Sequence, residues 1–132
     1  MIFAGTRPNN LGVKDGRLAP CPSSPNCVSS QSTDSLHQIP PLSFTSTAEQ
    51  ALSQLKGIIQ SLPRTKIITE AEDYLYAEFK SALMGFVDDV EFYLDSQAKV
   101  IHLRSASRLG YGDLGVNRQR IETIRALFNR SN

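Results

Sequence analysis

The hydrophobic and polar positions change their spacing along the chain. From about residue 48 to Leu62, apolar residues recur close to every 3.6 positions, which is the period of an amphipathic helix. Before this run, Ser46-Thr47-Ala48-Glu49 is typical of a capping box, in which Ser46 and Glu49 satisfy free amides of the first turn. Pro63 prevents the helix from continuing further. We therefore predict a helix over residues 47–61.

Four segments that are rich in β-branched and aromatic residues come next, separated by short breaks. We predict strands over 65–69, 74–80, 86–94 and 99–105, paired in chain order as an antiparallel meander. The break at 95–98 suits a hairpin. The opposing residues in the predicted register are Tyr93 and Val100, Glu91 and His102, and Asp89 and Arg104.

Alternation along these strands separates an apolar face from a polar one. Helical spacing returns from about Asn117 onward, with Ile121, Ile124 and Phe128 on one side. Both helices are expected to cover the apolar face. The predicted fold class is therefore α+β: a two-layer sandwich of a four-stranded antiparallel meander sheet with two helices on one face, in the order α-β-β-β-β-α.

The first 45 residues carry most of the prolines and show no sustained apolar period. Scattered apolar residues favour packing over disorder in this segment. We predict a single domain over residues 1–132, in which an irregular segment, 1–45, packs on an α+β core, 46–132. The irregular segment is expected to lie across part of the polar sheet face.

Composition limits the classes of partner. The chain has 132 residues, with 14 basic and 13 acidic ones, so its net charge of +1 favours no nucleic acid partner. No apolar run approaches the roughly 20 residues that cross a bilayer, so we expect no membrane insertion. A cytoplasmic location is expected if Met1 is the native start, and an extracytoplasmic or lumenal one if a targeting segment has been removed.

The cysteine and histidine spacing bears on metal and redox chemistry. Only Cys21 and Cys27 are present, and His37 and His102 lie far apart, so we expect no metal site and no cofactor. Prolines and an asparagine between the cysteines favour turns that bring the sulfurs together. The pair is a candidate disulfide. Two reduced thiols, or a thiol pair that cycles between the two states, remain the alternatives.

The densest polar stretch, residues 104–118, runs from a strand end to a helix start. Arg104 and Arg108, with helix amides and the hydroxyls of Ser105 and Ser107, are suited to hold a carboxylate or phosphate. Internal pairing is the alternative. In that case, the two arginines neutralise nearby carboxylates, and the glycines serve only the turn. The carboxylates available for such pairing are Asp88, Asp89, Glu91 and Asp113.

Three motifs resemble a known family. They are Cys21-Pro22-Ser23-Ser24-Pro25-Asn26-Cys27-Val28-Ser29-Ser30, Phe86-Val87-Asp88-Asp89-Val90-Glu91-Phe92, and Arg104-Ser105-Ala106-Ser107-Arg108 with Gly110-Tyr111 and the run from Asp113 to Arg118. Together they resemble the domain of unknown function 1499, whose name implies no activity. The resemblance implies that the three regions meet in space. The shared centre would contain Asn26, Asp89, Glu91, Arg104, Arg108 and Asp113.

Two hypotheses about function follow. The first is a non-catalytic binding or accessory module for an anionic small molecule or a protein segment. The second is an uncharacterised hydrolase-type enzyme in which His102 and Glu91 act as base and Arg104 or Arg108 stabilises negative charge, so catalysis stays open. The candidate ligand-binding residues are Asn26, Asp89, Glu91, His102, Arg104, Ser105, Ser107, Arg108, Asp113 and Arg118.

Overall fold

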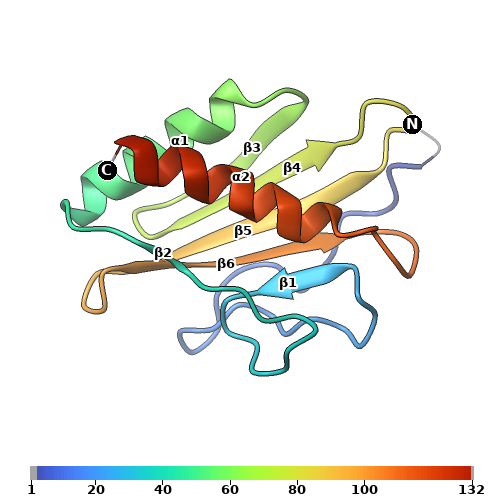
Figure 1. The fold of residues 1–132 in the computed structure, drawn as a ribbon, viewed down its shortest axis with the longest axis horizontal. Helices are drawn as coiled ribbons and strands as arrows, with labels where there is room; N and C mark the ends of the chain where they lie inside the picture. Colours follow the sequence, from blue (N-terminus) through green and yellow to red (C-terminus); the bar gives the residue numbers. More distant parts are fainter. Residues whose placement is uncertain (1–2, 132) are drawn as a thin grey trace.

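The computed structural model describes residues 3–131 and contains one antiparallel sheet with two helices on one face (Figure 1). This confirms the predicted α+β class and the placement of both helices. In chain order the elements are β1 (Cys27–Ser29), β2 (Leu42–Ser43), α1 (Ala48–Ser61), β3 (Thr65–Glu70), β4 (Tyr74–Lys80), β5 (Val87–Asp95), β6 (Val100–Ser107) and α2 (Val116–Ser131).

The sheet has more strands than predicted. Its order is β1-β6-β5-β4-β3, and β2 also pairs with β6. The predicted meander accounts for β3 to β6, but the strand count of four is wrong because β1 and β2 add to the outer edge of β6. Both short strands lie in the segment that was predicted to be irregular. They have three and two residues, too few for alternation to be visible in the sequence.

The predicted register of the hairpin between β5 and β6 is also wrong, by two positions. Tyr93 lies opposite His102 and Glu91 opposite Arg104. The turn occupies residues 96–99 because the Asp95 carboxylate accepts hydrogen bonds from the Gln97 and Ala98 amides, each at 3.1 Å. A shift of two leaves every side chain on its predicted face, since side chains alternate with period two.

The capping box of α1 lies one residue later than predicted. The Gln50 amide donates to the Thr47 hydroxyl, and the Thr47 amide donates to the Gln50 side-chain oxygen, each at 3.1 Å. Thr47 therefore caps the helix in place of Ser46, and Gln50 replaces Glu49. The helix ends at Ser61, before Leu62 takes an extended conformation ahead of Pro63.

The hydrophobic core lies between the helices and the apolar sheet face. Part of the segment before α1 joins it, since Val28, Ile39, Leu42 and Phe44 are buried there. The remaining buried core residues come from α1 (Ala51, Leu55, Ile59), β4 (Leu75, Ala77, Phe79), β5 (Val90, Phe92, Leu94), β6 (Ile101, Leu103) and α2 (Ile121, Ile124, Phe128).

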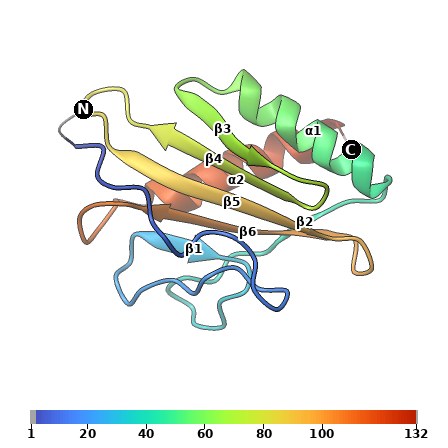
Figure 2. The same cartoon turned by 180° about the vertical axis from the view of Figure 1, so that it is seen from behind.

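Residues 5–20, which we call the N-terminal strap, cross the opposite face of the sheet (Figure 2). The Gly12 amide donates to Glu91 Oε2 at 2.7 Å, and Arg104 Nη2 donates to the Pro20 carbonyl at 3.3 Å. Gly12 has a φ of +100°, a conformation that L side chains rarely adopt. The strap ends at the disulfide between Cys21 and Cys27, which ties it to the start of β1.

Candidate functional site

The polar residues near the end of β5 and β6 do not form one centre. Asp88 and Asp89 are consecutive strand residues, so their side chains lie on opposite faces of the sheet. The six residues predicted to share one centre are therefore divided: Asp89, Glu91, Arg104 and Arg108 lie in a strap-side cluster, and Asn26 and Asp113 lie in a helix-side cluster. The strap-side cluster contains Tyr74, Tyr76, Glu78, Asp89, Glu91, Arg104 and Arg108, and the helix-side cluster contains Asn26, Asp88, Ser105, Ser107, Asp113, Asn117 and Arg120.

Arg108 is paired with two carboxylates inside the strap-side cluster. Its Nε and Nη2 donate to the two carboxylate oxygens of Asp89 at 2.9 and 2.8 Å, and Nη2 donates to Glu78 Oε2 at 2.6 Å. Hydrogen bonding to Asp89 raises the pKa of Arg108, and the bond to Glu78 adds to the effect, although burial opposes it. The geometry matches internal pairing of this guanidinium group rather than a free anion site.

Glu91 and Arg104 form a deeply buried pair under the strap. Glu91 is 1% exposed, and its Oε2 accepts hydrogen bonds from Gly12 N and from the Tyr74 hydroxyl. Burial and this bond to Glu91 raise the pKa of Tyr74. Burial lowers the pKa of Arg104, although the negative charge of Glu91 opposes the change. Arg104 Nη1 lies 4.0 Å from Glu91 Oε1, an atom with no hydrogen-bond partner among the described residues.

His102 does not face Glu91, contrary to the predicted register. It lies opposite Tyr93, with the two rings stacked at 6.4 Å between centroids, and its Nδ1 is 3.2 Å from the Ser30 hydroxyl. Burial lowers the pKa of His102. Arg118 lies apart from both clusters, because its guanidinium group donates to the carbonyls of Leu36 and Gln38.

Asn117 is the central residue of the helix-side cluster and is fully buried. Its side-chain oxygen accepts hydrogen bonds from Ser105 at 2.7 Å and Arg120 at 2.9 Å. Its amide donates to the Asn26 carbonyl, to the Ser107 hydroxyl and to Asp113 Oδ2. One side chain thereby joins the cysteine segment, the end of β6 and the turn before α2.

Asp113 holds the first turn of α2. Its carboxylate accepts hydrogen bonds from the amides of Gly115, at 2.8 Å, and Asn117, at 3.1 Å. Burial acts to raise the pKa of Asp113, but hydrogen bonds from Asn117 and Gly115 outweigh burial and lower it. A negative charge at this position also suits the positive end of the helix dipole.

Asn117 and Arg120 belong to the helix-side cluster but were not among the predicted site residues. Arg120 Nη2 forms an ion pair with Asp88 Oδ2 at 2.6 Å, and its guanidinium group lies 5.0 Å from the centroid of the Phe79 ring. Helical spacing could have indicated both residues, because positions 117 and 120 lie on the same face of the helix as the core residue Ile121. Polar residues on this face point toward the sheet.

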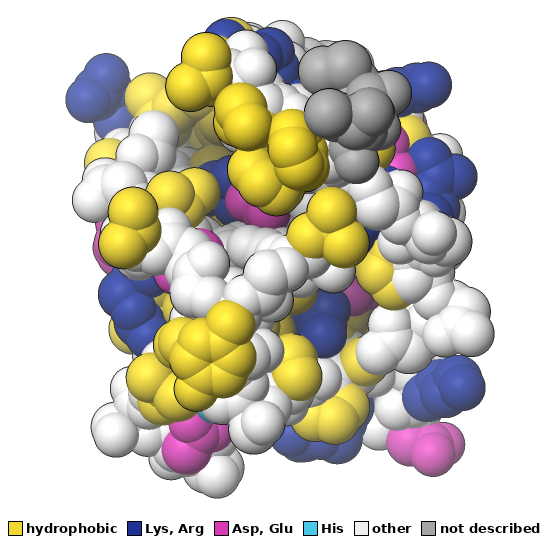
Figure 3. Space-filling view, turned by 90° about the vertical axis from the view of Figure 1, so that its right-hand side faces the viewer, with side chains coloured by type: hydrophobic (Ala, Val, Ile, Leu, Met, Phe, Trp, Pro, Cys, Tyr) yellow, Lys and Arg dark blue, Asp and Glu magenta, His cyan; other side chains and the backbone are white. Residues whose placement is uncertain are grey.

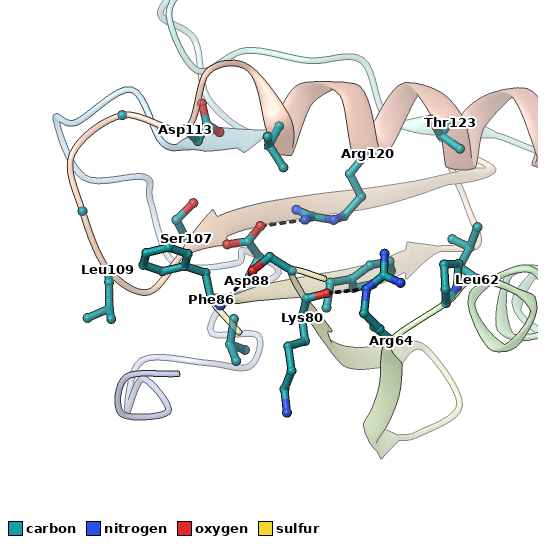
Figure 4. Close-up of a pocket in the computed structure, with 17 residues that line it drawn as sticks. Leu62, Arg64, Lys80, Phe86, Asp88, Ser107, Leu109, Asp113, Arg120 and Thr123 are labelled. Atoms are coloured by element: carbon teal, nitrogen blue, oxygen red, sulfur yellow. Dashed lines mark hydrogen bonds and ion pairs between the residues drawn. The ribbon is translucent and has the colours of Figure 1, made fainter. Parts of the chain in front are cut away.

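A cavity of about 520 Å³ opens at the end of the sheet where β4 ends and β5 begins. Hydrophobic side chains surround the hollow in the space-filling view (Figure 3). The paired Arg120 and Asp88 side chains meet inside it (Figure 4). Its lining residues are Leu62, Pro63, Arg64, Phe79, Lys80, Ser81, Phe86, Val87, Asp88, Ser107, Leu109, Gly110, Gly112, Asp113, Val116, Arg120 and Thr123.

The cavity includes only part of the predicted site. Ser107 and Asp113 line it, whereas His102, Arg104 and Arg108 do not. The hydrolase hypothesis needs His102 and an arginine to border a common cleft. In this cavity, that arrangement is absent.

A second hollow of about 300 Å³ adjoins the cavity and shares Arg64, Lys80 and Val87 with it. Three of its lining residues, Arg64, Lys66 and Lys80, are basic and exposed, and none of them takes part in an ion pair within residues 3–131. We call these three residues the basic trio. The carboxylate of Glu78, which also lines the hollow, is paired with Arg7 and Arg108, so no carboxylate among the described residues forms an ion pair with the basic trio.

Two further classes of site are absent from the part of the chain that the structure describes. Within residues 3–131, no group of three or more histidine, cysteine, aspartate or glutamate side chains is arranged to hold a metal ion. No helix in the same part of the chain is long and apolar enough to cross a membrane.

Comparisons with known proteins identify a family and give no relative of known activity. A family model described as protein of unknown function, DUF1499, matches residues 17–128. No curated protein and no solved structure matches the chain. The match covers all three motifs on which the resemblance was based, from the cysteine segment to the turn before α2. The chain therefore belongs to the DUF1499 family of proteins of unknown function.

Proposed function

We propose that the protein is a non-catalytic binding module for an anionic, amphipathic small molecule, held in the cavity at the end of the sheet. The observation that carries the proposal is the apolar cavity with the basic trio at its edge. Its volume, about 520 Å³, lies in the range of small-molecule sites in proteins, which are mostly apolar with a few polar groups.

The apolar walls would take the hydrophobic part of the ligand. Phe86, Leu109 and Val116 line the cavity yet remain 40 to 47% exposed. Covering one such side chain contributes about 1 kcal/mol to binding, since about half of it is already buried. A hydrocarbon chain or a fused ring would gain from several of these contacts at once.

The charge of the ligand follows from which basic groups are available. Arg120 is neutralised by Asp88, and Arg108 is used on the other face of the sheet. Arg64 and Lys80 line the cavity and have no carboxylate partner among the described residues. A carboxylate, sulfonate or phosphate on the ligand would supply the missing counter-charge.

The acidic groups of the cavity are suited to structure and not to proton transfer. Asp88 is paired with Arg120, and Asp113 accepts amide hydrogen bonds at the start of α2. No histidine or cysteine lines the cavity. A general base must be free to accept a proton from substrate, whereas Asp88 is held as the counter-ion of Arg120 and Asp113 as the cap of α2. These contacts favour binding over catalysis.

The test uses a fluorescent probe, 8-anilinonaphthalene-1-sulfonate, which is both apolar and anionic. We expect the probe to bind and laurate to displace it. Thr123→Trp should fill the cavity and abolish binding, whereas Ala126→Trp, at an exposed position of α2 outside the lining, should not. Circular dichroism would show that both variants fold.

Charge is tested separately. Arg64→Gln combined with Lys80→Gln should weaken laurate binding about tenfold and leave dodecanol binding unchanged, because only laurate carries a negative charge. The proposal is wrong if Thr123→Trp binds the probe normally, or if dodecanol competes as well as laurate in the unsubstituted protein.

A further inference from the structure

Two loops at the same end of the molecule carry nearly all of the exposed large hydrophobic side chains among the described residues. The first is residues 81–86, between β4 and β5, and the second is residues 109–116, which follow β6 and include the first residue of α2; we call them the end loops. They lie at the right-hand end of Figure 1, which faces the viewer in Figure 3. Within residues 3–131, seven of the eight such side chains are here: Leu83, Met84, Phe86, Leu109, Tyr111, Leu114 and Val116.

The cavity does not account for the most exposed of these residues. Leu83 is 88% exposed, Tyr111 is 72% exposed and Leu114 is fully exposed, and none of the three lines the cavity. Scattered exposed leucines are ordinary in soluble proteins, but a concentration on two adjoining loops marks an interaction site.

Leu114 supplies an independent observation. Its φ of +54° is in the left-handed region, which is uncommon for residues other than glycine, asparagine and aspartate. A leucine there costs conformational free energy and recovers none by burial within this chain. A strained residue that gains nothing within the fold points to a function outside it.

Charge is distributed unevenly between the two ends of the sheet. Segments 62–66, 79–88 and 107–120, at the end with the loops, contain six arginines and lysines and two aspartates; Arg108 and Arg120 are in ion pairs, so the basic trio and Arg118 are the four without a carboxylate partner among the described residues. At the opposite end, the turns at 70–73 and 95–99 contain four acidic residues and one lysine. The basic trio lies beside the end loops. This end of the molecule therefore complements a negatively charged surface.

From these observations we propose that the end loops dock the protein on a lipid bilayer that contains anionic headgroups. Leu83, Tyr111 and Leu114 enter the interfacial region, and the basic trio contacts the headgroup phosphates. Nearly complete exposure at separate loop tips suits a fluid phase that closes around each side chain, whereas a protein partner needs a continuous complementary surface. The docking requires no membrane-spanning segment and goes beyond ligand binding in the cavity.

The absence of tryptophan from the sequence makes a direct test possible. Single variants Leu83→Trp and Leu114→Trp should each show a blue shift of tryptophan emission, and quenching by brominated lipid, on vesicles of phosphatidylcholine with phosphatidylglycerol. Leu36→Trp is the matched control, since Leu36 is the one well-exposed large hydrophobic residue outside the end loops among the described residues. It should show neither effect.

Co-sedimentation with vesicles measures how strongly the protein partitions to the lipid. Leu83→Ser combined with Leu114→Ser should reduce partition to these vesicles about a hundredfold, about tenfold for each leucine. Replacing all three residues of the basic trio by glutamine should remove the preference over pure phosphatidylcholine vesicles. Added salt should weaken binding in the unsubstituted protein.

Several results would overturn the docking proposal. They are the absence of sedimentation with anionic vesicles, unchanged partition of the double serine variant, or equal partition to neutral and anionic vesicles. Self-association that the serine substitutions abolish, without vesicle binding, would assign the surface to a second copy of the chain instead. The docking proposal and the cavity proposal can be tested independently of each other. The Thr123→Trp variant should still bind vesicles, and the double serine variant should still bind the fluorescent probe.

Discussion

Arg108 is the side chain on which the strap-side cluster depends most. It makes two hydrogen bonds to Asp89, whose carboxylate is nearly inaccessible, and a third to Glu78. Burying two opposite charges is close to neutral in free energy when the geometry is good. Removing only one of them is costly, since the other charge is left without compensation.

We therefore expect Arg108→Met to lower the free energy of unfolding by about 3 kcal/mol, because Asp89 would remain buried without its partner. Arg108→Lys should lower it by about half as much, since a lysine keeps the charge but not the paired hydrogen bonds. Urea denaturation followed by circular dichroism provides the measurement. Arg130→Met, at an exposed position of α2, is the control and should have an effect below about 0.5 kcal/mol. Equal effects at the two positions would contradict the assigned role.

Individual residues of both clusters were visible in the sequence, but their partners were not. Charged residues on β5 and β6 were assigned to the correct faces, because alternation is a local property that a shift of two does not change. The partners are set by tertiary placement. Arg120 meets Asp88 across 32 positions, and Asn117 meets the Asn26 carbonyl across 91. No local pattern contains that information.

At the scale of elements, α2 depends on the turn before it. Asp113 accepts the amide hydrogen bonds that α2 cannot satisfy internally, and it also contacts the Asn117 side chain. Asp113 thus orients the helix as well as capping it. Gly115, with a φ of +80°, lets the chain turn from Asp113 into the helix.

Asp113→Ala should lower the free energy of unfolding by about 1 kcal/mol at neutral pH. The pKa of Asp113 is below its ordinary value of 3.8, so the stability that its charge contributes is fully present above about pH 4. That contribution is lost as the pH falls through the lowered pKa. The difference between the two proteins should therefore shrink in urea titrations near pH 2.5. A difference for Asp113→Ala that stays constant across this pH range would refute the charge-based account.

The longer elements were predictable and the shortest ones were not. Helix α1 and strands β3 to β6 lie within two residues of their predicted bounds, because each is long enough to show its period. The hairpin register depended on a single side chain, Asp95, which joins the turn by accepting two amide hydrogen bonds. Strands β1 and β2 exist because β6 offers them an edge, which is a property of the assembled sheet.

At the scale of the whole molecule, the N-terminal strap covers the buried charges of the strap-side cluster. It supplies the Gly12 amide to Glu91 and the Pro20 carbonyl to Arg104. The disulfide follows immediately after Pro20 and anchors this end of the strap to the edge strand β1. Burial of Glu91 and Arg104 therefore depends on a segment distant from them in sequence.

Replacing both cysteines by serine should lower the free energy of unfolding by about 2 kcal/mol, because the loop that the disulfide closes becomes unconstrained in the unfolded chain. Hydrogen exchange gives the more specific readout. The Gly12 amide should lose protection by a larger factor than the amides of β5, since the strap detaches before the sheet opens. Equal changes in both segments, or an unprotected strap in the oxidised protein, would contradict this dependence.

The sheet that separates Asp88 from Asp89 also has an evolutionary consequence. The two aspartates are adjacent in sequence but contact different arginines, Arg120 and Arg108. Each ion pair lies on its own side of the sheet, so selection acts on the two pairs separately. In an alignment of the family, we expect charge changes at position 88 to covary with position 120, and those at 89 with 108, but not 88 with 89. Two adjacent residues of one motif would then have been substituted independently during evolution.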